Sequence, residues 1–240
     1  MDYKNKIYEK YYSVQASHIK KTQGSDFLNS QFIVYDAYYQ KYLPRDKNAK
    51  IIDIACGDGS LVSWLENKGY GNSQGIDISK EQVALTKEHG IKNISQEDCF
   101  EFLPKHQAEF DAVFALDVLE HFPKTKAIEL LQLIFASLKP NGTLVFKTPN
   151  GESIFSGRYA YGDLTHETIF TCLSLREAFA LIGFSGAEFQ EAAPVIHGLI
   201  SFIRFVLWQI VRVFLNMYLL VEVGRTTQVL TQNIIGVAKK

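Results

Sequence analysis

The stretch IIDIACGDGSLVSWL, residues 51–65, decides the fold of this chain. Its first four residues predict a short buried strand, which runs into a turn containing Gly57 and Gly59 and then into a helical pattern over residues 59–68. A strand, a glycine turn and a helix in this order are typical of a nucleotide-binding corner, where backbone N–H groups approach the ligand. The rest of the sequence has to identify the nucleotide.

Beyond this corner, strand and helix patterns alternate as far as residue 147. Elements of this size in alternation favour βαβ units. We therefore predict an α/β fold, a doubly wound, Rossmann-like, seven-stranded and mostly parallel sheet with helices on both faces. The LKPNG segment, residues 138–142, predicts a turn that ends a helix and leads into the fifth strand. The predicted strands are 51–54, 74–77, 92–95, 110–116, 143–147, 186–191 and the C-terminal NIIGVAKK, and the predicted helices are 26–43, 59–68, 80–88, 124–138 and 174–182.

Three segments lie outside this alternation. The N-terminal residues are tyrosine-rich with a helical pattern, and we expect them to form a lid with Tyr11, Tyr12 or His18 near the ligand. An ordinary helix face is the alternative for these tyrosines. The predicted divisions are a helical lid at 1–46, a main domain at 47–240, a ligand-side segment at 150–173 within it, and a helical insertion before the last strand at 192–232.

Composition excludes several classes of protein. The chain has 240 residues, 47% of them hydrophobic, which is enough for a well-buried core and argues against disorder. Its formal net charge of −1 leaves no basic footprint, so we expect no nucleic-acid partner. The cysteines are odd in number and form no CxxC pair, so we expect Cys56 and Cys99 to pack in the core or a pocket. The N-terminus lacks the apolar core of a signal peptide, and we predict a cytoplasmic protein.

The turn itself argues against two common nucleotide ligands. A phosphate-binding loop needs a lysine after its glycines, and none follows Gly57 or Gly59 at the required spacing. A dinucleotide-binding turn needs a third glycine for close helix packing, which ACGDGSLV lacks, so a nicotinamide dehydrogenase is the weakest candidate. Asp53 inside the strand suits a different ligand, because its carboxylate can orient water or backbone around the ammonium group of an amino-acid moiety.

Further acidic residues follow the next strands. Asp77 ends the strand in GIDIS and can accept hydrogen bonds from two ribose hydroxyls, while Asp98 in SQEDCFEFL can accept from an adenine amino group. The stretch FDAVFALDVLEHF places Leu116, Asp117 and His121 at the C-terminal end of the fourth strand. Ligands of open α/β sheets bind in the crevice at that edge.

Taken together, these motifs resemble those of the class I S-adenosylmethionine (SAM)-dependent methyltransferases. DIACGDG resembles their first motif, D/E-x-G-x-G-x-G, with Ala55 in place of the first glycine, and GIDIS, EDCFEF, FDAVFALDVLEHF and LKPNGTLVFKTPN resemble the later motifs in order. DVLEHF and TPN are most similar to a subgroup with ubiquinone-biosynthesis O-methyltransferases and methyltransferases of bacterial surface-polysaccharide clusters. The resemblance spans residues 45–192 and implies SAM as cofactor and S-adenosylhomocysteine as product. The implied cofactor-binding residues are Asp53, Ala55, Cys56, Gly57, Gly59, Asp77, Ile78, Asp98, Cys99, Leu116 and Asp117.

Acceptor chemistry is predicted to reside in GRYAYGDLTHETIFTCLSL, after the fifth strand. A hydroxyl acceptor loses its proton during methyl transfer, so a base within hydrogen-bond reach speeds the reaction. His166 is the candidate base, with Asp163 orienting it or binding the acceptor, and His121 is a candidate to line the pocket beside the methyl group. A purely structural role for His166 is the alternative.

A metal site is a second possibility at the fourth strand. Asp117, Glu120 and His121 have the i, i+3, i+4 spacing of one helical face, and the ubiquinone-type enzymes that the chain resembles hold a divalent metal there. The first ligand is Asp here instead of the Glu usual in those enzymes, and a helical DxxEH more often lines a surface or pocket. We therefore favour no metal.

The stretch LISFIRFVLWQIVRVFLNMYLLVEV, residues 199–223, is long enough to cross a bilayer. Two arginines within it would each cost about 2.5–3.5 kcal/mol at mid-bilayer, and a span would separate the last strand from its sheet, so we predict no span. The apolar remainder favours burial on the sheet or a homodimer, and contact with a membrane surface is the alternative. The polar residues on one arc of about 140° are Ser201, Arg204, Gln209, Arg212, Asn216 and Glu222.

We expect a SAM-dependent methyltransferase that O-methylates a sugar or other small molecule. Its predicted context is bacterial surface-polysaccharide (capsule or O-antigen) biosynthesis, which follows from the resemblance alone. One alternative acceptor is a quinone or lipid-like phenol. An alternative of another class is an inactive SAM-binding subunit that supports a partner protein.

Overall fold

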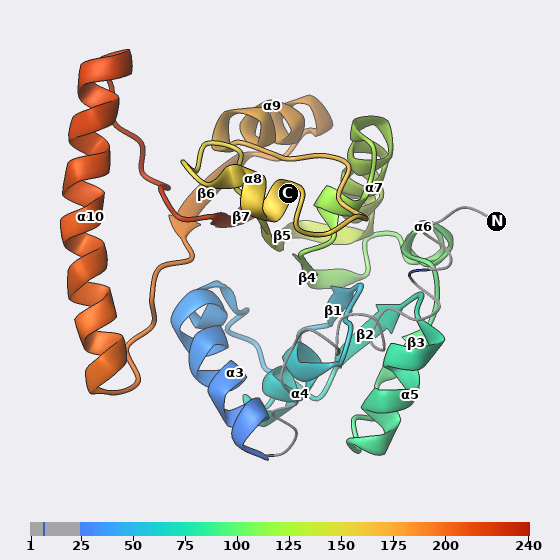
Figure 1. Cartoon of the computed structure of the whole chain (residues 1–240). Coiled ribbons are helices and arrows are strands. Elements are labelled where there is room, and N and C mark those ends of the chain that lie inside the picture. Colours follow the sequence, from blue (N-terminus) through green and yellow to red (C-terminus); the bar gives the residue numbers. More distant parts are fainter. Residues whose placement is uncertain (1–6, 8–24) are drawn as a thin grey trace.

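The seven predicted strands form one sheet in a computed structural model that describes Ile7 and residues 25–240 (Figure 1). Their order is β3-β2-β1-β4-β5-β7-β6, and among these strands β7 alone runs opposite to the other six. The predicted Rossmann-like, mostly parallel sheet is thereby confirmed. The strands are β1 Ile51–Ile54, β2 Ser73–Asp77, β3 Ile94–Gln96, β4 Phe110–Leu116, β5 Leu138–Pro149, β6 Gly186–Glu191 and β7 Asn233–Lys239.

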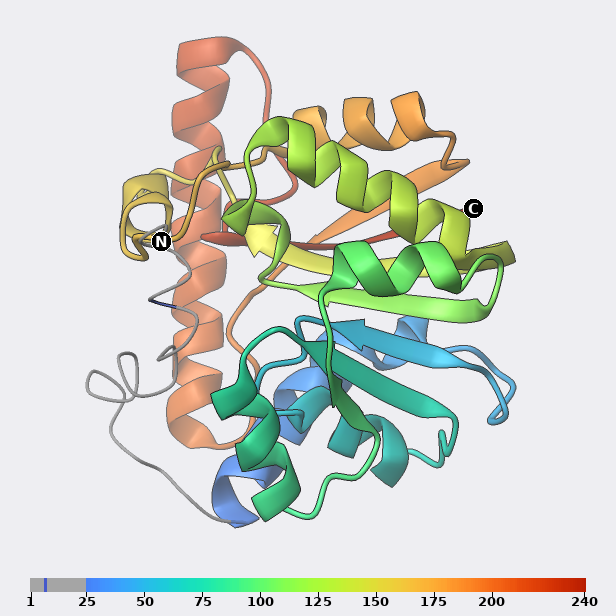
Figure 2. The same cartoon turned by 90° about the vertical axis from the view of Figure 1, so that its right-hand side faces the viewer.

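Helices cover both faces of the sheet (Figures 1 and 2). One face carries α3 Ser25–Tyr39, α4 Ser60–Asn67 and α5 Lys80–Glu88. The other carries α6 Cys99–Phe102, α7 Lys124–Ser137 and α9 Cys172–Ile182. The remaining helices are α8 Ser156–Ala160, α10 Leu199–Val223 and the 3-10 turns η1 Gln40–Tyr42, η2 Leu103–Lys105 and η3 Leu119–His121.

The central strands are apolar on both sides because both sides are covered. Ile51 and Phe114 pack with Trp64 of α4 on one face, whereas Val113 packs with Leu130 of α7 on the other. All five side chains are fully buried. This explains why the central strands are mostly apolar at consecutive positions of the sequence instead of alternating between apolar and polar residues.

The LKPNG segment differs from its prediction, because the structure places it inside β5 and not in a turn before it. Leu138 pairs with Phe110 of β4, and the register then shifts so that Thr143 pairs with Ala112. Between these pairs Asn141 adopts a left-handed φ of 64°. Turn-forming residues therefore produce an irregularity within a long strand, since pairing with β4 continues on both sides of it.

The last helix, α10, stands at the edge of the molecule (Figure 1). Of its side chains only Ser201 is buried, so the expected burial of its apolar side on the sheet is wrong, while the homodimer and the membrane contact stay predictions. Among the described residues, α10 is the one helix long and apolar enough to cross a membrane. The tyrosines Tyr11 and Tyr12 and His18, predicted to lie near the ligand, fall outside the described residues.

Candidate active site

A cavity of about 180 Å³ opens at the carboxyl ends of β1, β2 and β4, where the sequence predicted a ligand. A larger hollow of about 430 Å³ lies at the opposite ends of the strands, beside Lys50 and Ser73. Ligands of open α/β sheets bind at the carboxyl ends, so the smaller cavity is the candidate site. Of the predicted cofactor-binding residues, those that line it are Ala55, Gly57, Asp77, Ile78, Asp98, Cys99 and Asp117.

Both glycines of the first turn have a left-handed backbone, and Gly59 is also closely packed. Gly57 and Gly59 have left-handed φ values of 53° and 73°. A Cβ atom on Gly59 would lie 2.4 Å from the Cδ1 atom of Ile94, so any larger residue would collide with the third strand. Ala55 also has a left-handed φ, of 55°, which an L-residue adopts at a cost of about 1–2 kcal/mol. The strained turn exposes the backbone at the start of α4.

Asp77 fastens this turn to the end of β2. Its Oδ2 atom accepts a hydrogen bond from the Gly57 backbone N–H at 2.9 Å, and its Oδ1 atom accepts one from Ser79 N–H at 2.7 Å. Burial raises the pKa of Asp77, and the two hydrogen bonds partly offset that effect. The carboxylate oxygens retain lone pairs toward the cavity, where ribose hydroxyls can donate to them.

Asp53 lies on β1 and faces a second cavity, of about 300 Å³. It is almost completely buried, and this burial, with the Asp77 and Asp58 carboxylates nearby, raises its pKa well above the ordinary value. A buried carboxyl in this state gains from a cationic partner. An ammonium group in the second cavity would be such a partner.

The remaining predicted cofactor residues have simple local roles. Asp98 is the N-cap of α6 and accepts a hydrogen bond from Phe100 N–H at 2.8 Å. Cys56 packs so closely beneath β2 that a Cβ on Gly75 would lie 2.8 Å from its Sγ atom. Burial raises the pKa of Cys99 to about 12, and it raises that of Cys56 still further, so neither thiol is a nucleophile at neutral pH.

The second cavity joins the first at the turn and at the end of β4, because Ala55, Gly57 and Asp117 line both. Leu116 and tyrosines of α3 form further parts of its wall. Lys147 of β5 reaches into it and forms an ion pair with Asp117, with Nζ and Oδ2 2.5 Å apart. Burial acts to lower the pKa of Lys147, but Asp117 and Glu120 outweigh it and hold the pKa above its ordinary value.

Helix α3 closes one side of this second cavity. The Tyr35 hydroxyl lies 2.8 Å from Ser60 Oγ at the start of α4, and the Tyr38 hydroxyl donates to the Ala193 carbonyl at 2.6 Å. Both tyrosines line the cavity. Burial raises the pKa of each phenol, so both remain protonated near neutral pH. Neither phenol can act as a base there, and the one proton of Tyr38 is already donated to Ala193.

His121 is held by a relay from the segment after β5. The Thr165 hydroxyl donates to Asp163 Oδ1 at 2.6 Å, and His121 Nδ1 lies 2.8 Å from the same hydroxyl oxygen. A hydroxyl has one proton, so Thr165 accepts from the Nδ1–H of His121. In the neutral ring the lone pair is then on Nε2. Burial acts to raise the pKa of Asp163, but the Thr165 hydrogen bonds and the two nearby histidines hold it below its ordinary value.

His166 lies beside His121, with the two ring centres 4.8 Å apart. Its Nδ1 atom is 2.6 Å from the carbonyl oxygen of Tyr159, which can only accept, so Nδ1 carries the proton and Nε2 the lone pair. The predicted partner Asp163 therefore reaches His121 through Thr165, and the Tyr159 backbone orients His166. Both predicted histidines meet at one place, next to the cofactor cavity that His121 lines.

Glu120 attaches the acceptor-side segment to the end of β4. Its carbonyl oxygen accepts hydrogen bonds from the backbone N–H groups of Glu167 and Thr168, and its Oε2 atom accepts from the Thr148 hydroxyl at 3.0 Å. Burial, with Asp117 nearby, raises the pKa of Glu120 to about 8. The carboxyl group thus tends to hold its proton at neutral pH, which makes it a weak metal ligand in this state.

The group that could hold a metal differs from the predicted one. Ligand atoms of Glu120, His121 and His166 lie within 4.8 Å of one another, whereas Asp117 is occupied by Lys147. The preference for a metal-free reaction stays a prediction.

Several site residues were missed from the sequence. Lys147 is a charged residue in an otherwise apolar strand, TLVFK, and that contrast was a usable signal. Thr165 stands between the two predicted residues Asp163 and His166. The roles of Glu120 and Tyr35 depend on contacts between distant segments, and sequence reasoning assigned Glu120 only to a possible metal site.

Comparison with known proteins supports this reading of the fold. A methyltransferase domain family matches residues 30–188. A ubiquinone biosynthesis O-methyltransferase from Idiomarina loihiensis is 32% identical over 106 residues, which cover 42% of this chain and 42% of that protein. The chain therefore spans less than half the length of this curated relative.

Solved structures resemble the chain over nearly its whole length. A SAM-dependent methyltransferase from Archaeoglobus fulgidus superposes with a TM-score of 0.67 at 20% identity, covering 96% of this chain and 100% of that one. The DhpI–SAH complex superposes with a TM-score of 0.59 at 16% identity, covering 97% and 95%. At these identities the likeness concerns the fold.

Proposed function

We propose that this chain, which belongs to the methyltransferase domain family, transfers a methyl group from SAM to a hydroxyl oxygen of a small molecule. The observation that carries the proposal is the pair His121 and His166: His121 lines the cofactor cavity, and the ring centre of His166 lies 4.8 Å from that of His121. An acceptor hydroxyl needs such a base at the place where the methyl group arrives.

The cofactor half of the site supplies positioning. When bound, SAM provides a methyl group on a positively charged sulfur. In this proposal Asp77 accepts from the ribose hydroxyls and Asp98 from the adenine, while the amino-acid end enters the cavity that Asp53 lines. Alignment of donor and acceptor contributes much of the rate in such a displacement, and rigid strand ends provide it.

The histidine pair supplies proton transfer. As the acceptor oxygen attacks the methyl carbon, the carbon–sulfur bond breaks, its electrons return to sulfur, and the hydroxyl proton passes to a histidine Nε2. The Thr165–Asp163 relay stabilises His121 as it becomes charged, because a carboxylate with a low pKa lies at its end. The Nδ1–H of His166 is bound instead by the Tyr159 backbone carbonyl.

For the acceptor we propose a sugar or another small hydroxyl compound of a bacterial surface-polysaccharide pathway, as the sequence resemblance implies. A quinone-type phenol is the second candidate. It is favoured by the naming of the curated relatives and by the exposed Phe155, Tyr161 and Leu164 in the segment that carries His166. The cytoplasmic location stays a prediction.

The proposal is tested by incubating the purified chain with SAM and a panel of sugars, sugar nucleotides and catechols, with mass spectrometry of the products. We expect an O-methylated product with one acceptor class. His121→Gln and His166→Gln should each lower kcat by about 10²-fold without changing SAM affinity. His89→Gln, an exposed histidine at the end of α5, is the matched control and should be silent.

Other outcomes have definite meanings. Transfer to nitrogen or carbon, or full activity of the double histidine variant, would contradict the proposed base. SAM binding without turnover on any acceptor would favour the alternative of an inactive SAM-binding subunit. Loss of activity in metal-free buffer, restored by a divalent ion, would favour the metal alternative.

A further inference from the structure

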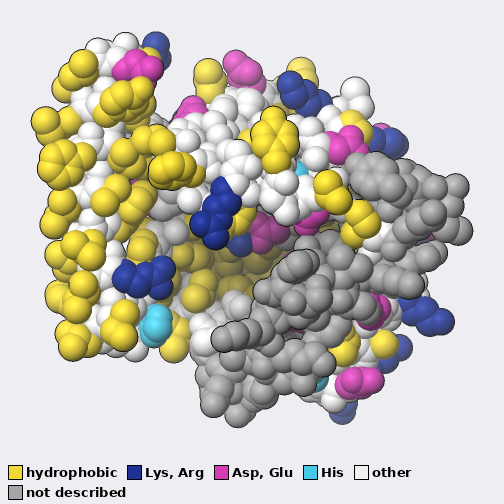
Figure 3. Space-filling view, viewed as in Figure 1, with side chains coloured by type: hydrophobic (Ala, Val, Ile, Leu, Met, Phe, Trp, Pro, Cys, Tyr) yellow, Lys and Arg dark blue, Asp and Glu magenta, His cyan; other side chains and the backbone are white. Residues whose placement is uncertain are grey.

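Helix α10 turns its apolar side to solvent, whereas an ordinary surface helix turns its apolar side to the protein. Its buried and half-buried side recurs every three or four residues, at Ser201, Phe205, Trp208, Arg212 and Leu215. The opposite half of the helix, an arc of about 180° at 100° per residue, carries apolar side chains and Tyr218. Those side chains face solvent, and a surface helix normally hides such an arc. Figure 3 shows hydrophobic side chains along the helix.

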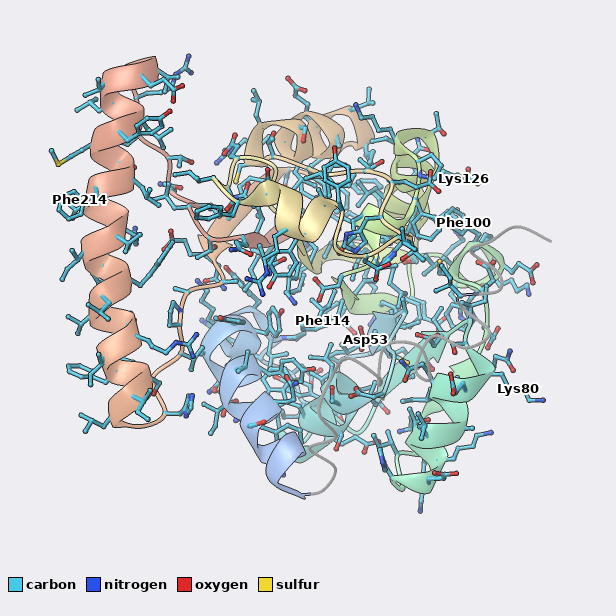
Figure 4. All side chains as sticks on the ribbon, viewed as in Figure 1. Asp53, Lys80, Phe100, Phe114, Lys126 and Phe214 are labelled. Atoms are coloured by element: carbon cyan, nitrogen blue, oxygen red, sulfur yellow. The ribbon has the colours of Figure 1, made fainter. Side chains whose placement is uncertain are left out.

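Polar contacts fix this orientation. Glu191, at the end of β6, accepts a hydrogen bond from Trp208 Nε1 at 3.3 Å and pairs with Arg212 Nε at 3.2 Å. Asn216 accepts from the Thr227 backbone N–H in the connection to β7. The polar side of α10 is thus bound to the protein, and rotating the helix would break these contacts. Figure 4 shows Phe214 on the side that points away from the sheet.

The outward arc is large and continuous. A helix of 25 residues is about 37 Å long. Isolated exposed apolar residues are normal, but a contiguous patch of this extent marks an interaction surface. Along the arc the exposed fractions reach 65% at Phe214 and 89% at Val221. The outward residues at its centre are Val206, Ile210, Val213, Phe214, Met217 and Val221.

The connectivity prevents the helix from crossing a bilayer. Strand β6 precedes α10 and strand β7 follows it, and the two strands pair with each other from Gly186↔Lys239 to Glu191↔Ile234. Both ends of the helix therefore return to one sheet on one side. A membrane could receive α10 only parallel to its plane.

The chemistry of the arc fits lipid better than a protein partner. Protein interfaces carry about one hydrogen bond per 100–200 Å². On this arc the only polar side-chain atom is the Tyr218 hydroxyl, which already interacts with Glu222 of the same helix. Pairing with a second α10 would hide a narrow seam and leave much of a half-circumference exposed, because helix pairs bury only their facing positions. A hydrocarbon layer covers the whole arc and requires no hydrogen bonds.

We propose that α10 docks this protein on a membrane surface, with its outward arc inserted among the lipid acyl chains and its polar side held against the protein by Glu191. Exposed Arg204 at the edge of the arc and Arg225 just beyond the helix lie at headgroup depth, where cations meet lipid phosphates. This inference does not depend on the proposed acceptor or on the histidine base.

Further exposed apolar side chains lie on the acceptor-side segment. Figures 1 and 2 place α8 and α10 on the side to which the parallel strands point. The acceptor-side segment on that side exposes Phe155 and Tyr161, with exposed fractions of 69% and 87%. These side chains add to the apolar surface on that side of the molecule.

The test is co-sedimentation of the full chain with vesicles of phosphatidylcholine, with and without phosphatidylglycerol. We expect the wild-type chain to bind both, and more tightly in the presence of the anionic lipid. Ile210→Glu/Phe214→Glu, two outward positions one helical turn apart, should lower vesicle binding by at least about tenfold. Leu181→Glu is the matched control: it is 76% exposed, on α9, and should bind as the wild type.

The neutral pair Ile210→Gln/Phe214→Gln provides a second variant, and calorimetric titration with SAM shows that every variant retains its folded site. Absence of vesicle binding by the wild type would overturn the proposal. The proposal would also be overturned if the chain bound only anionic vesicles, if salt abolished that binding, and if the glutamate pair did not change it. A dimer in light scattering that the glutamate pair dissociates, without vesicle binding, would assign the arc to a second copy of the chain.

Discussion

The two halves of the active site are built in different ways. On the cofactor side, backbone groups form most of the contacts described above. The N–H groups of Gly57 and Ser79 donate to Asp77, and the turn contains glycines with a left-handed φ. On the acceptor side, side chains from distant segments hold one another, as when Thr165, 44 residues from His121 in the sequence, links that histidine to Asp163. The strand ends determine the geometry of the cofactor side. The geometry of the acceptor side depends on loops whose conformation the sheet does not determine.

This difference has a functional consequence. Substitutions on the cofactor side should change the affinity for SAM with every acceptor, because they alter the strand ends and the turn that hold the cofactor. Changes on the acceptor side should alter turnover and leave SAM binding intact, because loops can vary on a fixed scaffold. The following substitutions test this separation.

Asp77→Ala should have the largest effect. It removes the proposed ribose acceptor and leaves the N–H groups of Gly57 and Ser79 without their partner, so SAM affinity should fall by about 100-fold or more. Calorimetric titration measures this. Asp111→Ala is the matched control, because Asp111 also accepts from a backbone N–H, that of Lys50, but at the opposite ends of the strands. Equal SAM affinity in the Asp77 and Asp111 variants would refute the assigned role.

Glu120→Gln tests the junction between the cofactor side and the acceptor side through the pH dependence of the free energy of unfolding. The folded pKa is about 8, whereas an unfolded glutamate titrates near its ordinary value of about 4.3. Between these values the unfolded chain has released a proton that the folded chain keeps, so this residue lowers the free energy of unfolding progressively as pH rises. Glutamine can still accept from Thr148 and does not titrate. The variant's stability advantage should therefore grow from about pH 4.3 to about pH 8.

Urea unfolding across that pH interval measures the effect. The exposed Glu129→Gln, on α7, is the control and should show no growing advantage. Parallel pH curves for the wild type and Glu120→Gln would mean that Glu120 is ionised in the folded chain.

Thr165→Val tests the acceptor side alone. Valine has the same shape but cannot connect His121 to Asp163, so kcat should fall by about tenfold and its pH profile should shift, while SAM affinity stays constant. Thr168→Val is the control, since the Thr168 hydroxyl donates to the Phe122 carbonyl and touches neither histidine. A similar loss in both variants, with unchanged pH profiles, would reduce Thr165 to a structural role.

The same division explains what the sequence could and could not predict. The bounds of β1 and β4 agree with their predictions, because a strand buried on both faces is mostly apolar at consecutive positions, interrupted here by Asp53 and Asp111. The orientation of His166 was beyond prediction, since its partner is the carbonyl of Tyr159, and a backbone carbonyl has no sequence signature. Asp163 was named as a candidate from its residue type and its position near His166. Its connection to His121 through Thr165 became visible only in the folded loop.

Helix α10 shows the same limit on a larger scale. Its periodicity separates a polar from an apolar arc, but periodicity does not say which arc meets the protein. That choice depends on Glu191, which lies on another element and binds both Trp208 and Arg212. The ordinary expectation, apolar side inward, was therefore wrong for a reason outside the helix.

Ala55→Gly should have the smallest effect, and it isolates the backbone character of the cofactor side. Ala55 stands where the family motif has glycine, and its φ of 55° is unfavourable for a residue with a Cβ. Glycine should relieve about 1 kcal/mol of strain, partly offset by its greater freedom in the unfolded chain, and raise the thermal midpoint by a few degrees at most. Ala115→Gly, in the buried part of β4, is the control and should lower it. If both substitutions destabilise the chain equally, the turn is not strained at Ala55. The alanine would then serve ligand binding, because Ala55 lines both cavities.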